Sequence, residues 1–462
     1  MNLKKFLKQN LAELFIIGIP IFLGFNLLLF VLSLFCVFLY FSFINKPYLF
    51  YLLVFVYKYG TLNLITVNVD FLNLLSISFG IYYSLKFFFD LNEKNSNNWT
   101  FAFLSIYLIL SSFLFSLLPL VSIYKSFGFI VYFSSLNYLG NRYSAELFHF
   151  LFILSFFLVV TSVLLPSSIT NYTELNLHAG ILKHSQAFGF LLTLLVPVQL
   201  IFYKKWINYK WILGLLLISV LLILISKMRS AYLVIVVLIM LIYFSSFFKN
   251  IKIGMTLILF VSVLGLFTMG GEILNDIFNK RNEHYDNKIE ATDEMYNSRF
   301  QLIEPSLMNF ESFPIFGIGF GIPTEITEKD FDIKERWGVK YFPGTNILIS
   351  LPTEKGVVYT AILEETGIIG CIFFLLFFMS FFRQLSFEKL LLILPVFVLS
   401  LGEASILSPN GIGFFGLLIL ILAKFSIFTK NKMNGTFELS NLSNAILLNN
   451  ISKEQNVWPS RT

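Results

Sequence analysis

Three groups of cationic residues and a pair of carboxylates are the features of this sequence that could do chemistry. The cationic residues are Lys183 and His184 in segment 177–189, Arg229 in segment 226–230, and Arg299. The planar guanidinium of arginine donates two parallel hydrogen bonds to phosphate oxygens, so this set predicts a site for an anionic, phosphate-bearing substrate. Each group also has an ordinary interpretation. Lys183 could be an interfacial lysine beside residues that cap a helix, and segment 226–230 could be a cytoplasmic turn. Arg299 could be an exposed arginine that pairs with a loop carboxylate.

The carboxylates Glu364 and Glu365 lie at the start of an apolar segment, and Glu354 precedes them. An acidic residue near a membrane span is costly unless it is paired or hydrated, which makes these residues functional candidates. A carboxylate or histidine beside the cations could accept the proton of an attacking hydroxyl. The alternative for Glu364 and Glu365 is capping of a helix N-terminus, where a negative charge is favoured.

Other catalytic motifs are missing from the sequence. We find no Walker loop, HExxH, Cys/His metal cluster or convincing serine-triad pattern. The glycine-rich run 317–321 lacks the strand-then-helix context of a nucleotide cradle and is expected to be a tight loop over the membrane surface. Cys36 and Cys371 lie inside apolar runs, so no disulfide framework is predicted.

The composition decides what kind of scaffold carries these residues. The 462-residue chain is 57% hydrophobic and 13% charged, and its mean hydropathy is +0.78. A soluble chain carries about 25% charged residues, so soluble domains are excluded. The net charge of +6 comes from basic residues scattered between apolar runs, which is typical of membrane-flanking charges and not of a nucleic-acid partner. The sequence therefore predicts an all-α polytopic membrane protein.

Apolar segments of about 20 residues predict the crossings. The candidates are 48–66, 71–89, 100–118, 119–138, 146–165, 187–203, 211–226, 231–248, 254–271, 362–382, 389–405 and 411–428. Residues 11–43 are too long for one helix and are expected to form a hairpin interrupted by Pro20 and Asn26. Lysines flank both ends of the chain, so both termini are predicted to be cytoplasmic and the number of crossings even. That number is 14, or 12 if 48–66 and 119–138 do not cross.

The acidic residues divide the chain into four parts. Segment 272–355 holds 15 of the 27 acidic residues and is predicted to be a large extracytoplasmic loop, with a short amphipathic helix at 298–313. It separates an N-terminal helix bundle, residues 1–271, from C-terminal helices over 356–429. The polar tail 430–462 is predicted to be cytoplasmic and largely disordered.

Five short motifs follow one another along the chain, in segments 180–189, 225–232, 298–300, 314–321 and 363–370. Their sequences and their order resemble the bacterial O-antigen ligase and O-antigen polymerase superfamily. The last reads Leu-Glu-Glu-Thr-Gly-Ile-Ile-Gly and is similar to the family's "E-x-G-I-I-G" helix. The resemblance covers roughly residues 170–425, whereas the first 170 residues match only as hydrophobic spans.

The resemblance implies glycosyl transfer without a metal at the outer face of the bacterial cytoplasmic (inner) membrane. The donor would be a glycan on undecaprenyl diphosphate, and the acceptor another lipid-linked glycan or a lipid A core. By the same resemblance, Arg229 corresponds to a membrane-edge arginine, Arg299 to the arginine that opens the loop helix, and Glu365 to the glutamate of the "E-x-G-I-I-G" helix. Lys183 and His184 would help to bind the diphosphate. A chain-length regulator and a flippase are the expected protein partners.

One departure from the family separates polymerase from ligase. Many ligases have a histidine just ahead of the "E-x-G-I-I-G" helix, but segment 352–361 has none, and His284 lies far upstream. The departure favours a polymerase, or a related exopolysaccharide polymerase, over a ligase. The general base is then Glu354, Glu365 or neither of them. The alternative from another class is a flippase or transporter, which should bury polar residues near the bilayer midplane. Lys58, Lys86 and Glu146 are the main candidates for such residues.

Overall fold

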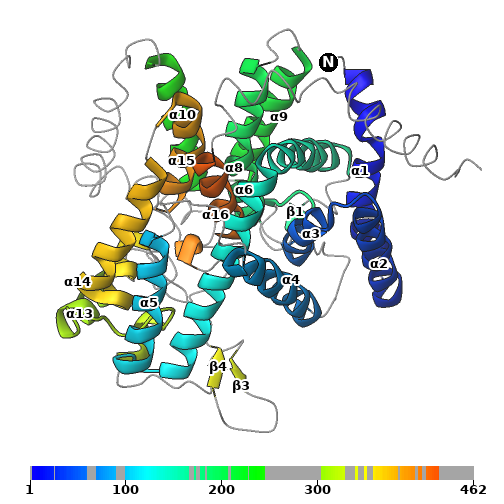
Figure 1. Cartoon of the computed structure of the whole chain (residues 1–462). Helices are drawn as coiled ribbons and strands as arrows, with labels where there is room; N and C mark the ends of the chain where they lie inside the picture. The colour runs from blue at the N-terminus through cyan, green and yellow to red at the C-terminus, as the bar shows by residue number, and fades with distance from the viewer. Residues whose placement is uncertain are drawn as a thin grey trace, which may run out of the picture.

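The computed structural model is a bundle of helices with two very short antiparallel hairpins (Figure 1). It describes residues 3–24, 26–59, 69–89, 99–165, 171–172, 177–182, 185–205, 210–226, 228–244, 303–327, 339–341, 348–350, 357–382, 385–400, 404–407 and 413–425. Five helices of this part are long and apolar enough to cross a membrane: Leu3–Leu23, Phe71–Phe89, Pro119–Leu164, Ser185–Lys204 and Val358–Phe382. The predicted all-α polytopic membrane fold is confirmed.

The elements follow the predicted apolar segments closely. The helices of the first half are α1 (Leu3–Leu23), α2 (Leu27–Phe43), α3 (Pro47–Tyr59), α4 (Val69–Phe89), α5 (Trp99–Leu114), α6 (Pro119–Leu164), α8 (Ser185–Lys205), α9 (Lys210–Ile225) and α10 (Arg229–Phe244). The later ones are α13 (Ile303–Ser312), α14 (Val358–Met379), α15 (Phe387–Leu399) and α16 (Gly413–Lys424), with 3-10 turns η4 (Thr324–Thr327), η6 (Ser380–Phe382) and η7 (Ala404–Leu407). The strands are β1 (Asn171–Tyr172), β2 (Leu177–His178), β3 (Lys340–Tyr341) and β4 (Leu348–Ser350). The candidate span 254–271 and the tail 430–462 lie outside the described residues.

The predicted hairpin at the start of the chain is present, and Asn26 makes its break. The Oδ1 atom of Asn26 accepts hydrogen bonds from the backbone N–H groups of Leu28 (2.9 Å) and Leu29 (3.3 Å), so Asn26 caps α2. Pro20 lies inside α1 and does not end it. A side-chain cap satisfies N–H groups that have no partner within the helix, which explains why the new helix starts directly after Asn26.

The predicted segments 119–138 and 146–165 are separated by a kink and not by a loop. Both belong to the 46-residue element α6, in which two helices meet at Tyr143, a residue with non-helical backbone angles (φ −126°, ψ 23°). At 1.5 Å per residue, α6 would be roughly 69 Å long if straight, more than twice the thickness of a bilayer core. The residues between the two segments include no proline, so the change of direction at Tyr143 is not a proline kink.

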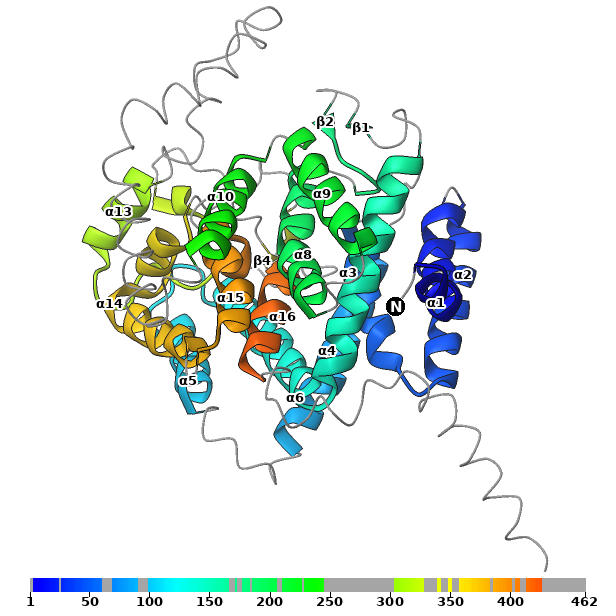
Figure 2. The same ribbon diagram turned by 90° about the horizontal axis from the view of Figure 1, so that it is seen from above.

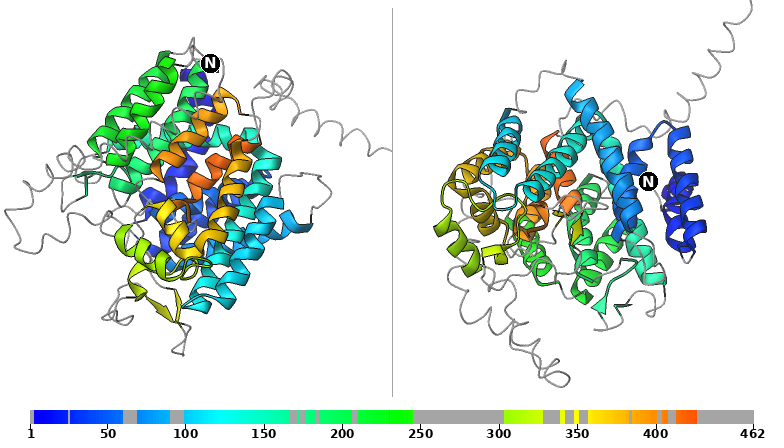
Figure 3. Two further views of the ribbon diagram at one scale, coloured as in Figure 1. Left: turned by 90° about the vertical axis from the view of Figure 1, so that its left-hand side faces the viewer. Right: turned by 90° about the horizontal axis from the view of Figure 1, so that it is seen from below.

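Helices α5, α13 and α14 lie together on one side of the bundle, and α1 and α2 lie on the other (Figure 2). The right-hand view of Figure 3 shows the same separation from below. The elements α13, β3 and β4, which belong to the predicted large loop, lie at the end of the bundle opposite the N-terminus (Figure 1). The side that holds α5, α13 and α14 contains the candidate site.

Candidate functional site

The centre of the site is a break in α14 at Gly367. This residue has φ 63° and ψ −168°, a conformation that essentially only glycine adopts. The break follows the two carboxylates of the predicted motif, Glu364 and Glu365. Both side chains are buried, with exposed fractions of 0% and 3%. Since α14 begins at Val358 with Val357 as its N-cap, capping of the helix start is the wrong interpretation of the pair.

The glycine-rich run docks into this break. The backbone N–H of Ile318 donates to the carbonyl oxygen of Glu364 (2.9 Å), and that of Gly319 donates to the carbonyl oxygen of Glu365 (3.0 Å). On the other side of the break, the N–H of Ile368 donates to the carbonyl oxygen of Pro314 (2.9 Å). The loop and the helix therefore satisfy each other's backbone groups where α14 is interrupted.

Left-handed backbone and close approach explain the glycines of this run. Gly317, Gly319 and Gly321 have φ values of 73°, 119° and 73°. A Cβ on Gly317 would lie less than 3.0 Å from the backbone of Glu365. The loop N–H groups donate to α14, so they are not arranged as a phosphate cradle. The expected tight loop is confirmed, and the structure gives it a specific partner.

The Glu364 carboxylate joins three segments of the chain. It accepts hydrogen bonds from Ser306 Oγ (2.9 Å) and Asn309 Nδ2 (2.7 Å), both on α13, and from Thr324 Oγ1 (3.1 Å) at the start of η4. A buried carboxylate is stable only when such donors replace its hydration. Glu364 therefore ties α13 and η4, which belong to the predicted loop, to the membrane helix α14.

Glu365 holds the far end of the glycine-rich run. Its Oε2 atom accepts a hydrogen bond from the N–H of Gly321 (2.9 Å). The side chain of Lys125 lies over the same glycine, since a Cβ on Gly321 would be 2.7 Å from Lys125 Cγ. The charges of Lys125 and Glu365 interact across this contact. Glu365 is thus the one predicted site residue whose side chain is among the described residues.

The first half of the chain also contributes to the site, which the sequence motifs did not predict. The N–H of Leu117, in the connection between α5 and α6, donates to the carbonyl oxygen of Ile318 (2.9 Å). The Tyr107 hydroxyl donates to the carbonyl oxygen of Thr366. The ring of Phe115 stacks on that of Phe316, with the ring centroids 3.8 Å apart. The break in α14 is therefore enclosed by the glycine-rich run and by α5 with its following turn.

The other predicted site residues lie outside the part of the chain that the structure describes, in whole or in their side chains. These are the residues Lys183, His184, Arg299 and Glu354 and the side chain of Arg229. The described parts of two predicted segments nevertheless meet: a Cβ on Gly189 would lie 2.7 Å from Ser226 Oγ and 2.9 Å from Met228 Cβ. Helix α8, which begins at Ser185, therefore approaches the connection between α9 and α10.

His178 is a further histidine of segment 177–189, and none of the predicted roles includes it. Its ring is 9% exposed and lies edge-on to Phe188, with the centroids 5.4 Å apart. Burial lowers the pKa of His178 below its usual value, because burial disfavours the charged ring. In the sequence, only the position of His178 five residues before Lys183 could have suggested that it lies near the predicted cations.

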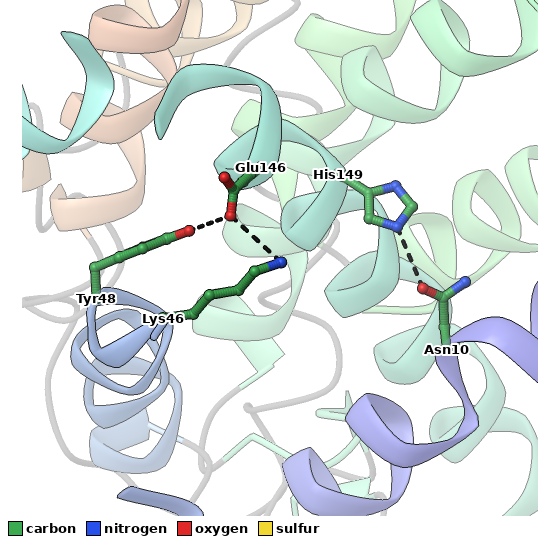
Figure 4. Close-up of polar contacts among 5 residues, drawn as sticks. All are labelled: Asn10, Lys46, Tyr48, Glu146 and His149. Atoms are coloured by element: carbon green, nitrogen blue, oxygen red, sulfur yellow. Dashed lines mark hydrogen bonds and ion pairs between the residues drawn. The ribbon is translucent and has the colours of Figure 1, made fainter. Parts of the chain in front are cut away.

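The mid-span charge Glu146 has a structural explanation (Figure 4). Its carboxylate pairs with Lys46 Nζ at 3.3 Å and accepts a hydrogen bond from the Tyr48 hydroxyl. The Tyr48 ring stacks on Tyr143, the kink residue of α6, at 4.1 Å. Nearby, His149 Nε2 lies 3.2 Å from Asn10 Oδ1 on α1. These contacts fasten α1 and α3 to the kink, so Glu146 does not require a transport pathway to explain it.

We expect Glu146→Gln to leave glycan synthesis unchanged and to lower the free energy of unfolding by at most about 1 kcal/mol, because the pair is partly exposed. The side chains of Lys46 and Glu146 are 29% and 45% exposed. Thermal unfolding of purified protein and a gel of surface glycans would measure both effects. A variant that folds normally but loses the glycan would show that this cluster takes part in function.

Comparison with known protein families agrees with the motifs. Residues 213–375 match the family model of the O-antigen ligases. The matched segment contains Arg229, Arg299, the glycine-rich run and Glu365, and it excludes Lys183 and His184. A comparison with curated proteins gave no match. Among the described residues, no group of three or more His, Cys, Asp or Glu side chains could hold a metal ion. The match over residues 213–375 confirms the predicted resemblance of this membrane protein to the O-antigen ligase and polymerase superfamily.

Proposed function

We propose that the protein polymerises oligosaccharide repeat units carried on undecaprenyl diphosphate into O-antigen or a related surface polysaccharide. The observation that carries this proposal is the family match over residues 213–375, in a multi-pass membrane protein whose large loop is fastened to α14. The missing histidine in segment 352–361 favours polymerase over ligase. The site would lie at the outer face of the inner membrane, with both chain ends in the cytoplasm.

In the proposed reaction, a sugar hydroxyl of the acceptor attacks the anomeric carbon of the donor glycan. The bond from that carbon to the diphosphate oxygen breaks, and undecaprenyl diphosphate leaves with the electron pair. Lys183, His184, Arg229 and Arg299 bind the diphosphate and stabilise the charge that develops on it. A carboxylate takes the proton of the attacking hydroxyl. No cofactor takes part in this scheme.

The two candidate bases differ in their surroundings. Glu365 is 3% exposed and its Oε2 atom already accepts the N–H of Gly321, so little of its carboxylate is open to an acceptor hydroxyl. We therefore assign the proton transfer to Glu354, which precedes α14, and assign to Glu365 the positioning of the glycine-rich run. The proposed partners are the lipid-linked donor and acceptor, a chain-length regulator and a flippase.

The domain boundaries follow the same scheme. Residues 1–271 and 356–429 form the membrane part, 272–355 the extracytoplasmic loop, and 430–462 a cytoplasmic tail. In this scheme, Glu364 of α14 accepts hydrogen bonds from α13 and η4 of the proposed loop.

Arg229→Ala should lower the rate of chain elongation on the order of a hundredfold, because one donor to the developing charge is lost. A deletion strain that produces the variant should carry single repeats in place of a ladder of long chains, at a wild-type amount of protein in the membrane. A gel of the surface glycan makes the measurement, and Lys86→Ala serves as the control because its ammonium lies over the Tyr82 ring of its own helix. Wild-type chain lengths would refute the role of Arg229. Long chains retained on undecaprenyl diphosphate would indicate a ligase.

A further inference from the structure

Lys125 is a cation beside the candidate site that belongs to neither the motifs nor the matched segment. It lies in the second turn of α6, close to the helix start at Pro119, and its side chain is half-buried. The aliphatic stem of Lys125 packs against Gly321. A Cβ atom at position 321 would lie 2.7 Å from Lys125 Cγ and 2.8 Å from Lys125 Cβ, so a larger residue at this position would clash. This contact fixes the direction of the side chain along the end of the glycine-rich run.

Lys125 is held near Glu365 but is not paired with it. Glu365 accepts the N–H of Gly321, and the stem of Lys125 packs against the same glycine, so both side chains contact one residue. The ion pairs of Lys46 with Glu146 and of Lys204 with Glu388 lie elsewhere in the described part of the chain and do not include Lys125. A half-buried ammonium near a membrane span is costly unless water, a counter-charge or an anionic ligand compensates it.

The docking of the loop determines where this cation lies. The N–H of Leu117 donates to Ile318, so the connection before α6 is fastened to the glycine-rich run. The same run is fastened to the break in α14, which brings the first turns of α6 to the carboxylate motif of the matched segment. The elements α13, β3 and β4 of the predicted loop lie at the end of the bundle away from the N-terminus, where the donor headgroup is expected (Figure 1).

We propose that Lys125 is a further cation of the donor site, contributed by the first half of the chain, and that it binds the diphosphate of the lipid-linked glycan. This inference rests on the proposed function. Lysine suits this role as a compact charge on a flexible stem, complementing the forked contacts expected of Arg229 and Arg299. Glu365 is the carboxylate whose charge interacts with that of Lys125.

Binding of undecaprenyl diphosphate to the purified full-length protein in lipid nanodiscs tests the proposal without requiring turnover. We expect Lys125→Gln to raise the Kd about tenfold and Lys125→Arg to restore most of the affinity. Lys86→Gln is the matched control, since it removes a half-buried helical lysine away from the site. Undecaprenol, which lacks both phosphates, should bind equally to all variants. Equal Kd values for wild type and Lys125→Gln would overturn the proposal.

A double variant separates ligand binding from charge balance. If Lys125 only neutralises Glu365, then adding Glu365→Gln to Lys125→Gln should return the Kd to the wild-type value, and the proposal fails. If Lys125 binds the diphosphate, the double variant should bind no better than Lys125→Gln. Failure of the proposed function is distinguishable from both, because the wild-type protein would then show no preference for undecaprenyl diphosphate over undecaprenol.

Discussion

Gly367→Ala should destabilise the protein by about 3 kcal/mol and shorten or abolish the glycan chains. The substitution places a side chain where φ is 63° and ψ is −168°, and residues other than glycine pay about 1–3 kcal/mol for such a conformation. The new Cβ would also lie less than 3.0 Å from the carbonyl of Ile315, so the glycine-rich run would have to move. Overpacking of this kind costs a further 1–3 kcal/mol.

Thermal unfolding of purified Gly367→Ala and a gel of its glycans would measure the two effects. Gly128→Ala is the matched control, because it changes a glycine of the membrane helix α6 that has open space around its Cβ position. The control should be as stable as wild type or slightly more so, since alanine favours a helix. Equal stabilities of the two variants would show that the break at Gly367 does not hold the loop.

Glu364→Ala should have an effect of similar size, for a different reason. It removes the shared acceptor of Ser306, Asn309 and Thr324. Each buried donor left without a partner costs about 1–3 kcal/mol, so a loss on the order of 3 kcal/mol or more is expected. The predicted loop would then lose its attachment to α14, and chain elongation should fall with it.

Limited proteolysis of the loop, together with unfolding of purified Glu364→Ala, would check this prediction. Glu311→Ala is the control, because Glu311 is an exposed carboxylate on the same helix, α13. Ser306→Ala should show a smaller loss than Glu364→Ala, because it removes only one of the three hydrogen bonds. A loop as resistant to protease in Glu364→Ala as in Glu311→Ala would contradict the attachment.

Hydrophobic segments and helix caps made much of the fold predictable. The membrane crossings follow from runs of apolar residues, whose side chains are buried in the bundle or face lipid. Asn26 interrupts the first of these runs by capping α2. The continuous α6 was not predictable in the same way, because charged and polar residues around Tyr143 are compatible with both a turn and a kinked helix. Contacts that form only in the fold, such as those of Tyr48 with Glu146 and Tyr143, decide between them.

The candidate site was predictable as a set of motifs but not as an assembly. The Glu-Glu-Thr-Gly segment and the glycine-rich run were both recognisable in the sequence. The distance between them along the chain does not indicate that the glycine-rich run docks into a break in the helix that carries the glutamates. The different roles of Glu364 and Glu365 follow from their partners, on α13 and η4 in one case and at Gly321 in the other. Lys125 lies about 240 positions before Glu365 and outside every motif, so only the fold brings them together.

Extension of a defined donor by the purified protein tests the central claim most directly. Undecaprenyl-diphosphate-linked single repeats would be incubated with the wild-type protein in lipid vesicles and the products separated by length. The proposed polymerase should produce lipid-linked chains of two and more repeats, and Arg229→Ala should leave single repeats. Single repeats that remain unextended by wild type, but are transferred to an added lipid A core, would contradict polymerisation and establish a ligase.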